Sequence, residues 1–233
     1  MFSRNFYYRL KYQLEKKAPY LVFFYFMLDR IKHPFVRSQK KIYRKLHMDC
    51  LKKKQTTTDF FSINAYYWYK IINKNFKKFS YLEIGSWEGN SALYILNNFE
   101  TYNVVCVDFW EKNKDLQPNT NFENFKLNMS EFENKYSFTR DTSDNFFIKN
   151  NEKFDIAYID GSHEVEQVYR DINNAWACLN VNGILICDDY FYGNIYADSR
   201  NVPAEAINKF IKQNNNLKII CVNNSQIFLK KIK

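Results

Sequence analysis

From Phe79 to the C-terminus, short apolar runs alternate with segments of helical pattern, and this alternation restricts the fold more than any other feature. Continuous apolar strands separated by helices indicate a parallel sheet that helices cover on both faces. The strand candidates are residues 81–84, 103–107, 136–140, 154–159, 183–187, 217–222 and 226–230. The helix candidates are residues 91–98, 121–134, 164–179 and 204–213.

The last two strand candidates differ from the others because only residues 223–225 separate them. So short a connection predicts an antiparallel hairpin at the end of the sheet. The predicted fold class is therefore α/β, with a doubly wound, mostly parallel seven-stranded sheet, a C-terminal antiparallel hairpin and an N-terminal helical extension. We expect two parts, the extension over residues 1–55 and the α/β domain over 56–233.

The extension is strongly basic. Residues 1–54 contain 15 Lys and Arg against 3 acidic residues, a balance of +12, whereas the remainder contains 19 against 22, a balance of −3. Such a segment can meet anionic lipid, nucleic acid or an acidic partner. Its longest uncharged run, residues 18–28, is too short to cross a bilayer as a helix.

The pattern predicts helices over residues 5–54, with breaks near Lys16 and Pro34. A further helix is predicted from Thr58 or Asp59 to about Asn73, with one apolar face. That predicted face consists of Phe60, Ile63, Tyr67 and Ile71.

The five cysteines form no C-x-x-C pair, so neither a zinc site nor a disulfide framework is indicated. Cys106, Cys187 and Cys221 lie within apolar runs, where a free thiol acts as a small hydrophobe. This usage favours a reducing compartment. The expected location is the cytoplasm, with attachment to the membrane periphery left open.

A glycine loop follows the first strand candidate, in the stretch YLEIGSWEGNSALYIL. Gly85 and Gly89 enclose it, and a helix is expected to start at Asn90 or Ser91. A glycine turn between a first strand and a helix is where an open α/β sheet holds its ligand. Glu83 and Glu88 flank the loop and favour a ligand with positive charge. A plain tight turn is the alternative.

The pattern E-I-G-x-x-x-G-x-S after a first strand resembles motif I of class I S-adenosylmethionine-dependent methyltransferases, most closely their O-methyltransferase branch. The resemblance implies S-adenosylmethionine as cofactor. Asp108, at the end of the second strand, corresponds to the acid that accepts hydrogen bonds from the ribose hydroxyls. Trp110 is a candidate for stacking on the adenine or for the core. The implied cofactor residues are Glu83, Gly85, Ser86, Gly89, Ser91, Asp108, Ser143 and Asp160.

Two further strand candidates end on acidic residues, the fourth on Asp160 and the fifth on Asp188 and Asp189. Three carboxylates at one edge repel one another unless a cation neutralises them. The pattern therefore predicts a hard divalent ion with oxygen ligands, Mg²⁺ or another divalent cation. In the alternative, Asp188 and Asp189 cap a turn while Asp160 binds the cofactor amine or a backbone amide.

The same stretch, IDGSHEVEQVYRDI with GILICDDY, resembles metal-dependent small-molecule O-methyltransferases of the catechol and macrolide-sugar types. The resemblance implies that Asp160 and His163 are catalytic, with His163 as the general base, and that the acceptor is a small molecule or a saccharide. Asn182-Gly183 stands where two glycines are usual. The segment of residues 191–201 is longer than the loop at this position in that family.

Two other functions remain open. A nucleic-acid methyltransferase would use the basic segment, but the Asn/Asp-Pro-Pro-Tyr type motif is replaced here by Asp160-Gly161-Ser162-His163, so nucleic acid is not the expected partner. A non-catalytic membrane-associated protein could share the fold. The extension itself has two candidate roles, a lid and homodimer contact or an interfacial helix on an anionic membrane.

Overall fold

The computed structural model describes residues 4–110, 120–192 and 201–233. The chain forms two compact units, which are described separately. The glycine-loop unit comprises residues 33–150, and the hairpin unit comprises residues 1–32 and 151–233. Helix α2 (Tyr20–Leu51) contributes to both units, because it begins in the hairpin unit and ends in the glycine-loop unit.

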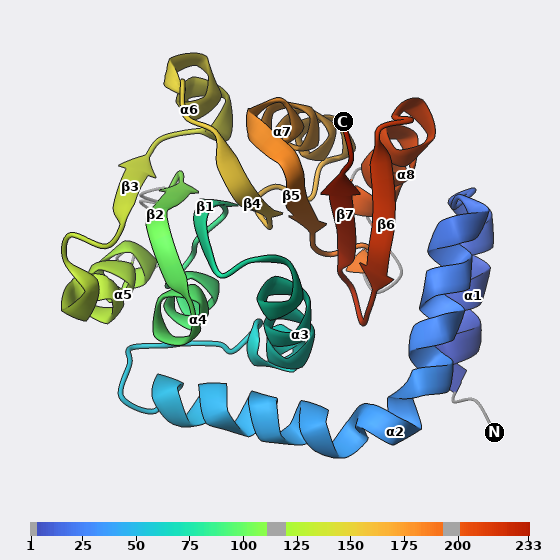
Figure 1. The fold of residues 1–233 in the computed structure, drawn as a ribbon, viewed down its shortest axis with the longest axis horizontal. Coiled ribbons are helices and arrows are strands. Elements are labelled where there is room, and N and C mark those ends of the chain that lie inside the picture. Colours follow the sequence, from blue (N-terminus) through green and yellow to red (C-terminus); the bar gives the residue numbers. More distant parts are fainter. Residues whose placement is uncertain (1–3, 111–119, 193–200) are drawn as a thin grey trace. The chain divides into compact units, whose positions relative to one another are not determined.

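The glycine-loop unit contains three parallel strands in the order β3-β2-β1 (Figure 1). The apolar ends of β1 and β2 are buried without alternation, as in a sheet covered on both faces. After α2, its elements are η1 (Ser62–Asn64), α3 (Ala65–Asn75), β1 (Lys78–Ile84), α4 (Asn90–Asn98), β2 (Glu100–Asp108), α5 (Thr120–Met129), η2 (Ser130–Phe132), β3 (Ser137–Arg140) and α6 (Ser143–Lys149).

The hairpin unit has the strand order β4-β5-β7-β6, in which β4 and β5 are parallel and β7 is antiparallel to both of its neighbours. Helix α7 packs on α8, β4 and β5. The elements of this unit are α1 (Arg4–Glu15), the start of α2, β4 (Phe154–Ile159), α7 (Val165–Cys178), β5 (Leu179–Cys187), α8 (Pro203–Gln213), β6 (Leu217–Val222) and β7 (Ile227–Lys231).

The strand order β3-β2-β1-β4-β5-β7-β6 confirms the predicted fold class. All seven predicted strands are present, and β4 and β6 have the predicted bounds. The antiparallel hairpin is also confirmed, because Leu217–Val222 pairs with Ile227–Lys231. The predicted division into residues 1–55 and 56–233 stays a prediction, since compact units describe packing and not independent folding.

Three details differ from the sequence-based expectations. The prediction of a helix break near Pro34 was wrong, because α2 continues through this residue. The predicted apolar face of the helix before β1 was wrong in part: Tyr67 is buried as predicted, but Phe60 and Ile63 are exposed and precede α3. Trp68 and Ile72 are buried in their place. Helix α6 was not predicted, although Thr142 caps it by accepting a hydrogen bond from the Asn145 N–H.

The N-terminal extension is packed into the core of the hairpin unit. Phe6, Tyr12, Val22 and Phe26 are buried there. The Arg9 guanidinium donates to the carbonyl of Asn224 at 2.7 Å. The extension therefore contributes core side chains and is not a detached arm.

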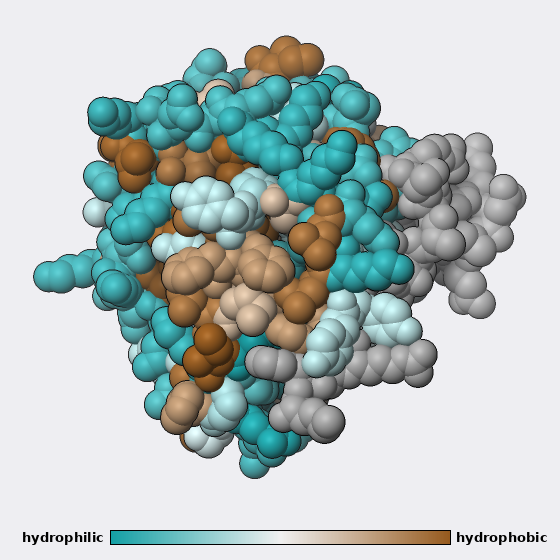
Figure 2. Space-filling view, turned by 90° about the vertical axis from the view of Figure 1, so that its right-hand side faces the viewer, coloured by the Kyte–Doolittle hydropathy of each residue, from teal (hydrophilic) through white to brown (hydrophobic). Residues whose placement is uncertain are grey.

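The same extension also carries exposed apolar side chains. On α1 these are Tyr7, Tyr8 and Leu14, and on the first turns of α2 they include Tyr20 and Phe24. Figure 2 shows apolar side chains gathered in the middle of the face where α1 lies, bordered by hydrophilic ones. No helix within the described ranges is both long and apolar enough to cross a bilayer.

A buried histidine in the glycine-loop unit predicts how stability depends on pH. His47 lies edge-on to the rings of Phe61 and Tyr94, and burial lowers its pKa to about 4. Below the ordinary imidazole pKa of about 6.5, the unfolded chain takes up a proton that the folded chain does not. The contribution of neutral His47 to the unfolding free energy is therefore fully present above pH 7 and is lost as the pH falls toward 4.

The expected loss between pH 7 and pH 4.5 is about 2–3 kcal/mol of unfolding free energy from this one group. His47→Phe removes the titrating ring and keeps an aromatic side chain between Phe61 and Tyr94. Urea unfolding of both proteins at the two pH values should show a smaller loss in the variant by about this amount. Equal losses in the two proteins would contradict the assignment.

Candidate active site

The glycine loop connects β1 to α4 in a conformation that requires its glycines. Gly85 has a φ of +90° and Gly89 a φ of +86°, in the left-handed region that other residues rarely adopt. Gly89 is also the N-cap of α4, and a Cβ atom there would lie 3.2 Å from Cδ2 of Phe125. Both positions therefore favour glycine, and Gly89 packs closely against the side chains of Phe125 and Met129.

Asp108, at the end of β2, holds this loop in place. Its Oδ2 accepts the backbone N–H of Trp87 at 2.8 Å, and its Oδ1 accepts that of Trp110 at 2.8 Å. Burial raises the pKa of Asp108, while these N–H groups act in the opposite direction because they favour the carboxylate. The acid predicted to bind a ribose thus already orders the loop that would surround the ligand.

Glu83 and Ser91 form a buried pair beneath the loop. The Ser91 hydroxyl donates to Oε1 of Glu83, whose side chain is fully buried. Burial raises the pKa of Glu83 to about 8, so this group carries a proton at neutral pH. The expectation that Glu83 favours a positively charged ligand stays a prediction, and the structure places this side chain beneath the loop.

Glu88 is also directed into the protein. Its Oε2 accepts the backbone N–H of Thr57 at 2.7 Å, and its Oε1 accepts the side-chain amide of Asn124 at 2.8 Å. Asn128 donates to the carbonyls of Glu88 and Gln55, at 2.9 Å each. Glu88 thus fixes the segment before α3 to the loop and does not face a ligand.

The remaining predicted cofactor residues of this unit lie around Asp108. Ser86 is buried within the loop. Ser143 is the first residue of α6, and two residues before it the Asp141 N–H donates to the Asp108 carbonyl at 3.2 Å. Trp110 is a core residue, because it is buried and packs against Phe125 with 4.6 Å between ring centroids.

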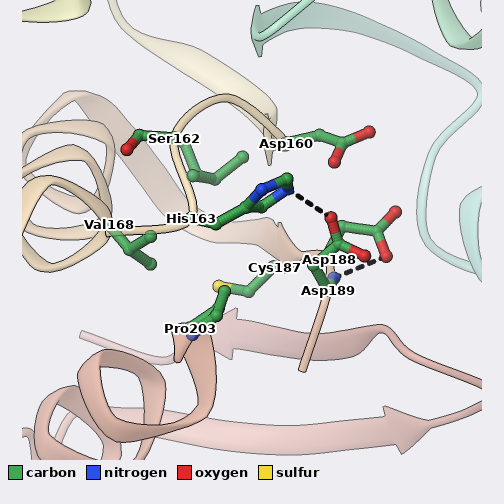
Figure 3. A pocket seen from close by; sticks show the side chains of 9 residues that line it. Asp160, Ser162, His163, Val168, Cys187, Asp188, Asp189 and Pro203 are labelled. Atoms are coloured by element: carbon green, nitrogen blue, oxygen red, sulfur yellow. Dashed lines mark hydrogen bonds and ion pairs between the residues drawn. The ribbon is translucent and has the colours of Figure 1, made fainter. Parts of the chain in front are cut away.

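The acidic edge belongs to the hairpin unit, at the ends of β4 and β5. A pocket there is lined by Ile159, Asp160, Ser162, His163, Val168, Cys187, Asp188, Asp189 and Pro203 (Figure 3). Residues two apart on a strand share a face, so Tyr158 and Asp160 lie on the same side of β4. The Tyr158 hydroxyl lies 2.7 Å from Oδ2 of Asp160 and 2.5 Å from Oδ2 of Asp188.

Asp188 is held by donors from three directions. Besides Tyr158, the Gln226 side-chain amide donates to its Oδ2 at 2.6 Å, and the Asp189 N–H donates to its Oδ1 at 2.7 Å. Burial, with Asp189 adding like charge, raises the pKa of Asp188 to about 6. The donors partly offset this cost because they stabilise the ionised form.

Asp189 pairs with the predicted base. Its Oδ2 lies 2.7 Å from Nε2 of His163, and both side chains are about one third exposed. A carboxylate only accepts, so Nε2 carries the hydrogen and Nδ1 is the nitrogen that can take up a proton. The Tyr192 ring stacks on the imidazole at 3.9 Å, and Asp189 adopts a φ of +54° that is uncommon for a residue with a side chain.

The predicted metal ligands were tested against this geometry. Asp160, Asp188 and Asp189 have the oxygen chemistry that Mg²⁺ prefers. In the described parts of the chain, however, no group of three or more His, Cys, Asp or Glu side chains is arranged to hold a metal ion. Asp160 and Asp188 share the Tyr158 hydroxyl, and Asp189 faces His163. The arrangement does not fit a preformed metal centre, and the metal stays a prediction.

Three contributors to this site were missed by sequence reasoning. Tyr158 could have been found from its position two residues before Asp160 on a strand. Gln226 gives no local signal, because the pairing of β7 with β5 brings it to Asp188. Tyr192 lies in a stretch considered only for its length.

Comparisons with known proteins agree with the fold and the glycine loop. The model of a family described as "Methyltransferase domain" matches residues 82–190. A search of curated proteins found no match. Residues 82–190 therefore have the sequence pattern of a methyltransferase domain, in agreement with the resemblance seen in the sequence.

Solved structures with the same fold include O-methyltransferases. The O-methyltransferase from Bacillus cereus in complex with SAH has a TM-score of 0.58 at 10% identity, covering 91% of this chain and 100% of that one. A putative caffeoyl-CoA O-methyltransferase from Staphylococcus aureus has a TM-score of 0.56 at 19% identity, covering 94% and 99%. An rRNA methylase from Streptococcus thermophilus reaches 0.50 at 11% identity, covering 67% and 89%. Identities this low establish the fold alone.

The loop geometry predicts the effect of a small side chain at Gly89. Gly89→Ala places a Cβ against Phe125 at a φ of +86°, and should lower the unfolding free energy by about 1–3 kcal/mol. Asn182→Gly is the matched control, since Asn182 has a φ of +69° and glycine relieves any strain there. Urea titrations of both variants would test this. A Gly89→Ala protein as stable as the wild type would contradict the stated need for glycine.

Proposed function

We propose that the protein is an S-adenosylmethionine-dependent O-methyltransferase that acts on a hydroxyl group of a small molecule or saccharide. One observation carries the choice of reaction: a histidine oriented by a carboxylate lies in a pocket at the carboxyl ends of parallel strands. A hydroxyl is a poor nucleophile at neutral pH, so its methylation benefits from a base held in one orientation.

The cofactor half of the proposal rests on the glycine-loop unit. The cofactor supplies an activated methyl group when bound. The loop between Gly85 and Gly89 would accommodate its amino-acid portion. The Asp108 carboxylate accepts backbone N–H groups from the loop and from the end of β2, including those of Trp87 and Trp110, and would accept the ribose hydroxyls at its remaining lone pairs. Protonated Glu83 adds no charge beneath the loop.

The base half rests on the hairpin unit. His163 would take the proton of the acceptor hydroxyl on Nδ1, because Nε2 already donates to Asp189. Asp189 would then stabilise the imidazolium that forms, and the stacked Tyr192 ring would hold the imidazole plane. Asp189 thus acts as a positioning residue for the base.

Asp160 and the metal remain separate proposals. The resemblance to metal-dependent enzymes gives Asp160, Asp188 and Asp189 a shared cation. The hydrogen bonds of the described residues favour the alternative in which neighbouring donors hold Asp188 and Asp189, while Asp160, which also contacts the Tyr158 hydroxyl, binds the cofactor amine. Chelation distinguishes the two.

Methylation of nucleic acid is not favoured. The fold occurs in an rRNA methylase as well as in O-methyltransferases, so it does not choose between them. The segment after β4 is Asp-Gly-Ser-His, which supplies a base and lacks the Pro-Pro-Tyr type element of base methylation. A non-catalytic role is not favoured either, because the glycine loop and the oriented histidine are both intact.

Cofactor binding gives the first test. Calorimetry with S-adenosylhomocysteine should show binding to the wild type, and Asp108→Ala should weaken it by about 10- to 100-fold through lost hydrogen bonds to a charged acceptor. Glu152→Ala removes an exposed carboxylate outside the candidate site and should bind like the wild type. A variant that fails to bind because it is unfolded is not informative. Thermal melting of each variant therefore accompanies the binding measurement. Binding of NAD in place of S-adenosylhomocysteine would refute the proposal.

Turnover gives the second test. In a cofactor-consumption screen over sugars, glycans, catechols and RNA, His163→Ala should lower the rate on the accepted substrate by about 10²–10⁴. Asp189→Asn keeps the base but loses its orientation, and should lower kcat by up to about 10²-fold. Cofactor affinity should stay unchanged in both. His33→Ala is the matched control and should keep full activity, whereas a fully active His163→Ala would remove that residue from the mechanism.

Exhaustive chelation gives the third test. If Asp160, Asp188 and Asp189 hold an essential cation, chelator stops turnover and Mg²⁺ restores it. Unchanged turnover after chelation, with loss of activity in Asp160→Ala, would identify Asp160 as a residue that acts without metal. Metal analysis of the purified protein provides an independent readout.

A further inference from the structure

Helix α2 carries an apolar stripe on the side that faces solvent. In the hairpin unit, Tyr20 is 79% exposed, Phe24 51% and Ile31 56%. These residues are spaced by four and seven positions, which places them on one side of the helix. A core-packed helix usually exposes polar residues on its outer side, so this stripe is unusual.

The part of α2 in the glycine-loop unit repeats the pattern by itself. Phe35 is 83% exposed, Ile42 57% and Leu46 60%, again at intervals of seven and four. His47 and Leu51 are buried, so this part of the helix already uses its other side for packing.

Basic side chains accompany the stripe. Arg37, Lys41, Arg44 and Lys45 are exposed, and none of them forms an ion pair with a described residue. Of the two acids in α2, Asp29 is buried beside Arg30, and Asp49 pairs with Lys52 at 2.6 Å. The solvent side of the helix therefore combines large apolar groups with an excess of positive charge, of which, among the described residues, only Lys45 has an acid, Asp49, nearby.

We propose that this side of α2 binds an anionic lipid surface, with the helix lying in the headgroup region. The stripe of Tyr, Phe, Ile and Leu would enter the boundary with the acyl chains, while the basic residues meet lipid phosphates and carboxylates. On α1, which belongs to the hairpin unit, Tyr7, Tyr8 and Leu14 are also exposed.

Charge decides against a second copy of the chain as the occupant. Two α2 helices packed along their stripes would bring Lys45 and Lys41 of each copy, which flank the stripe, toward the partner helix, whereas Arg37 and Arg44 lie on the far side of the helix. Stable helix pairs use opposite charges at such flanking positions, and like charges repel there. An anionic surface turns the same residues into attractive contacts, each worth about 1 kcal/mol near the membrane.

The experiment is flotation of the full chain with vesicles. Binding is expected to vesicles of phosphatidylcholine with phosphatidylserine and not to phosphatidylcholine alone. Replacing Arg37, Lys41, Arg44 and Lys45 by Gln should lower the partition coefficient by about 10²-fold or more. The control removes four other exposed charges, Lys74, Lys77, Lys218 and Lys233, and should bind like the wild type.

A second variant tests the apolar stripe. Phe35→Ser, Ile42→Ser and Leu46→Ser together should lower the partition coefficient by about tenfold or more, because buried apolar area is lost. Ile148→Ser and Leu127→Ser, at exposed apolar positions elsewhere, serve as the control. Thermal melting confirms that every variant folds.

Three results would overturn the proposal. One is failure of the wild type to bind anionic vesicles. Another is binding that the four-charge variant retains in full. The third is a concentration-dependent dimer without lipid binding that the apolar variant abolishes, because it would assign the stripe to self-association. None of these readouts depends on methyl transfer.

Discussion

The carboxylate of Asp108 is the interaction on which the candidate cofactor site depends. It accepts the backbone N–H groups of Trp87 and Trp110, and so joins the end of β2 to the glycine loop that follows β1. An anion held by backbone donors orders the loop effectively, because each bond is charge-assisted. The glycines of the loop adopt the left-handed conformations that its turns require.

Burial changes the pKa of an acid in each of the two units. Glu83 lies under the loop with its pKa raised to about 8, and the pKa of Asp188 is raised to about 6. Desolvation disfavours the charged form in both cases, and the difference lies in the donors, because Tyr158, Gln226 and a backbone N–H serve Asp188. Glu83 is therefore neutral beneath the loop. In the hairpin unit, donors hold Asp188, and Asp189 orients His163.

Helix α2 shows how one element serves two environments. Its inner side supplies core residues such as Val22, Phe26 and His47, and its outer side keeps exposed Phe24, Phe35 and Ile42. The sequence indicated a basic, aromatic segment, but composition does not tell a core face from an outer one. That distinction needs the packing partners, since Phe26 and Phe24 differ only in which side of the helix they occupy.

The sequence alone determined the strand pattern, the terminal hairpin, the glycine loop and the acidic strand ends, because period, turn chemistry and residue type are local properties. It also brought His163 and Asp160 forward. Only the tertiary structure decided what the acids do. Glu88 turned inward to Thr57 and Asn124, Asp189 turned to His163, and Asp188 received Gln226 from a strand 38 residues later in the chain. Which donors surround a carboxylate depends on contacts between distant segments, and no local pattern encodes them.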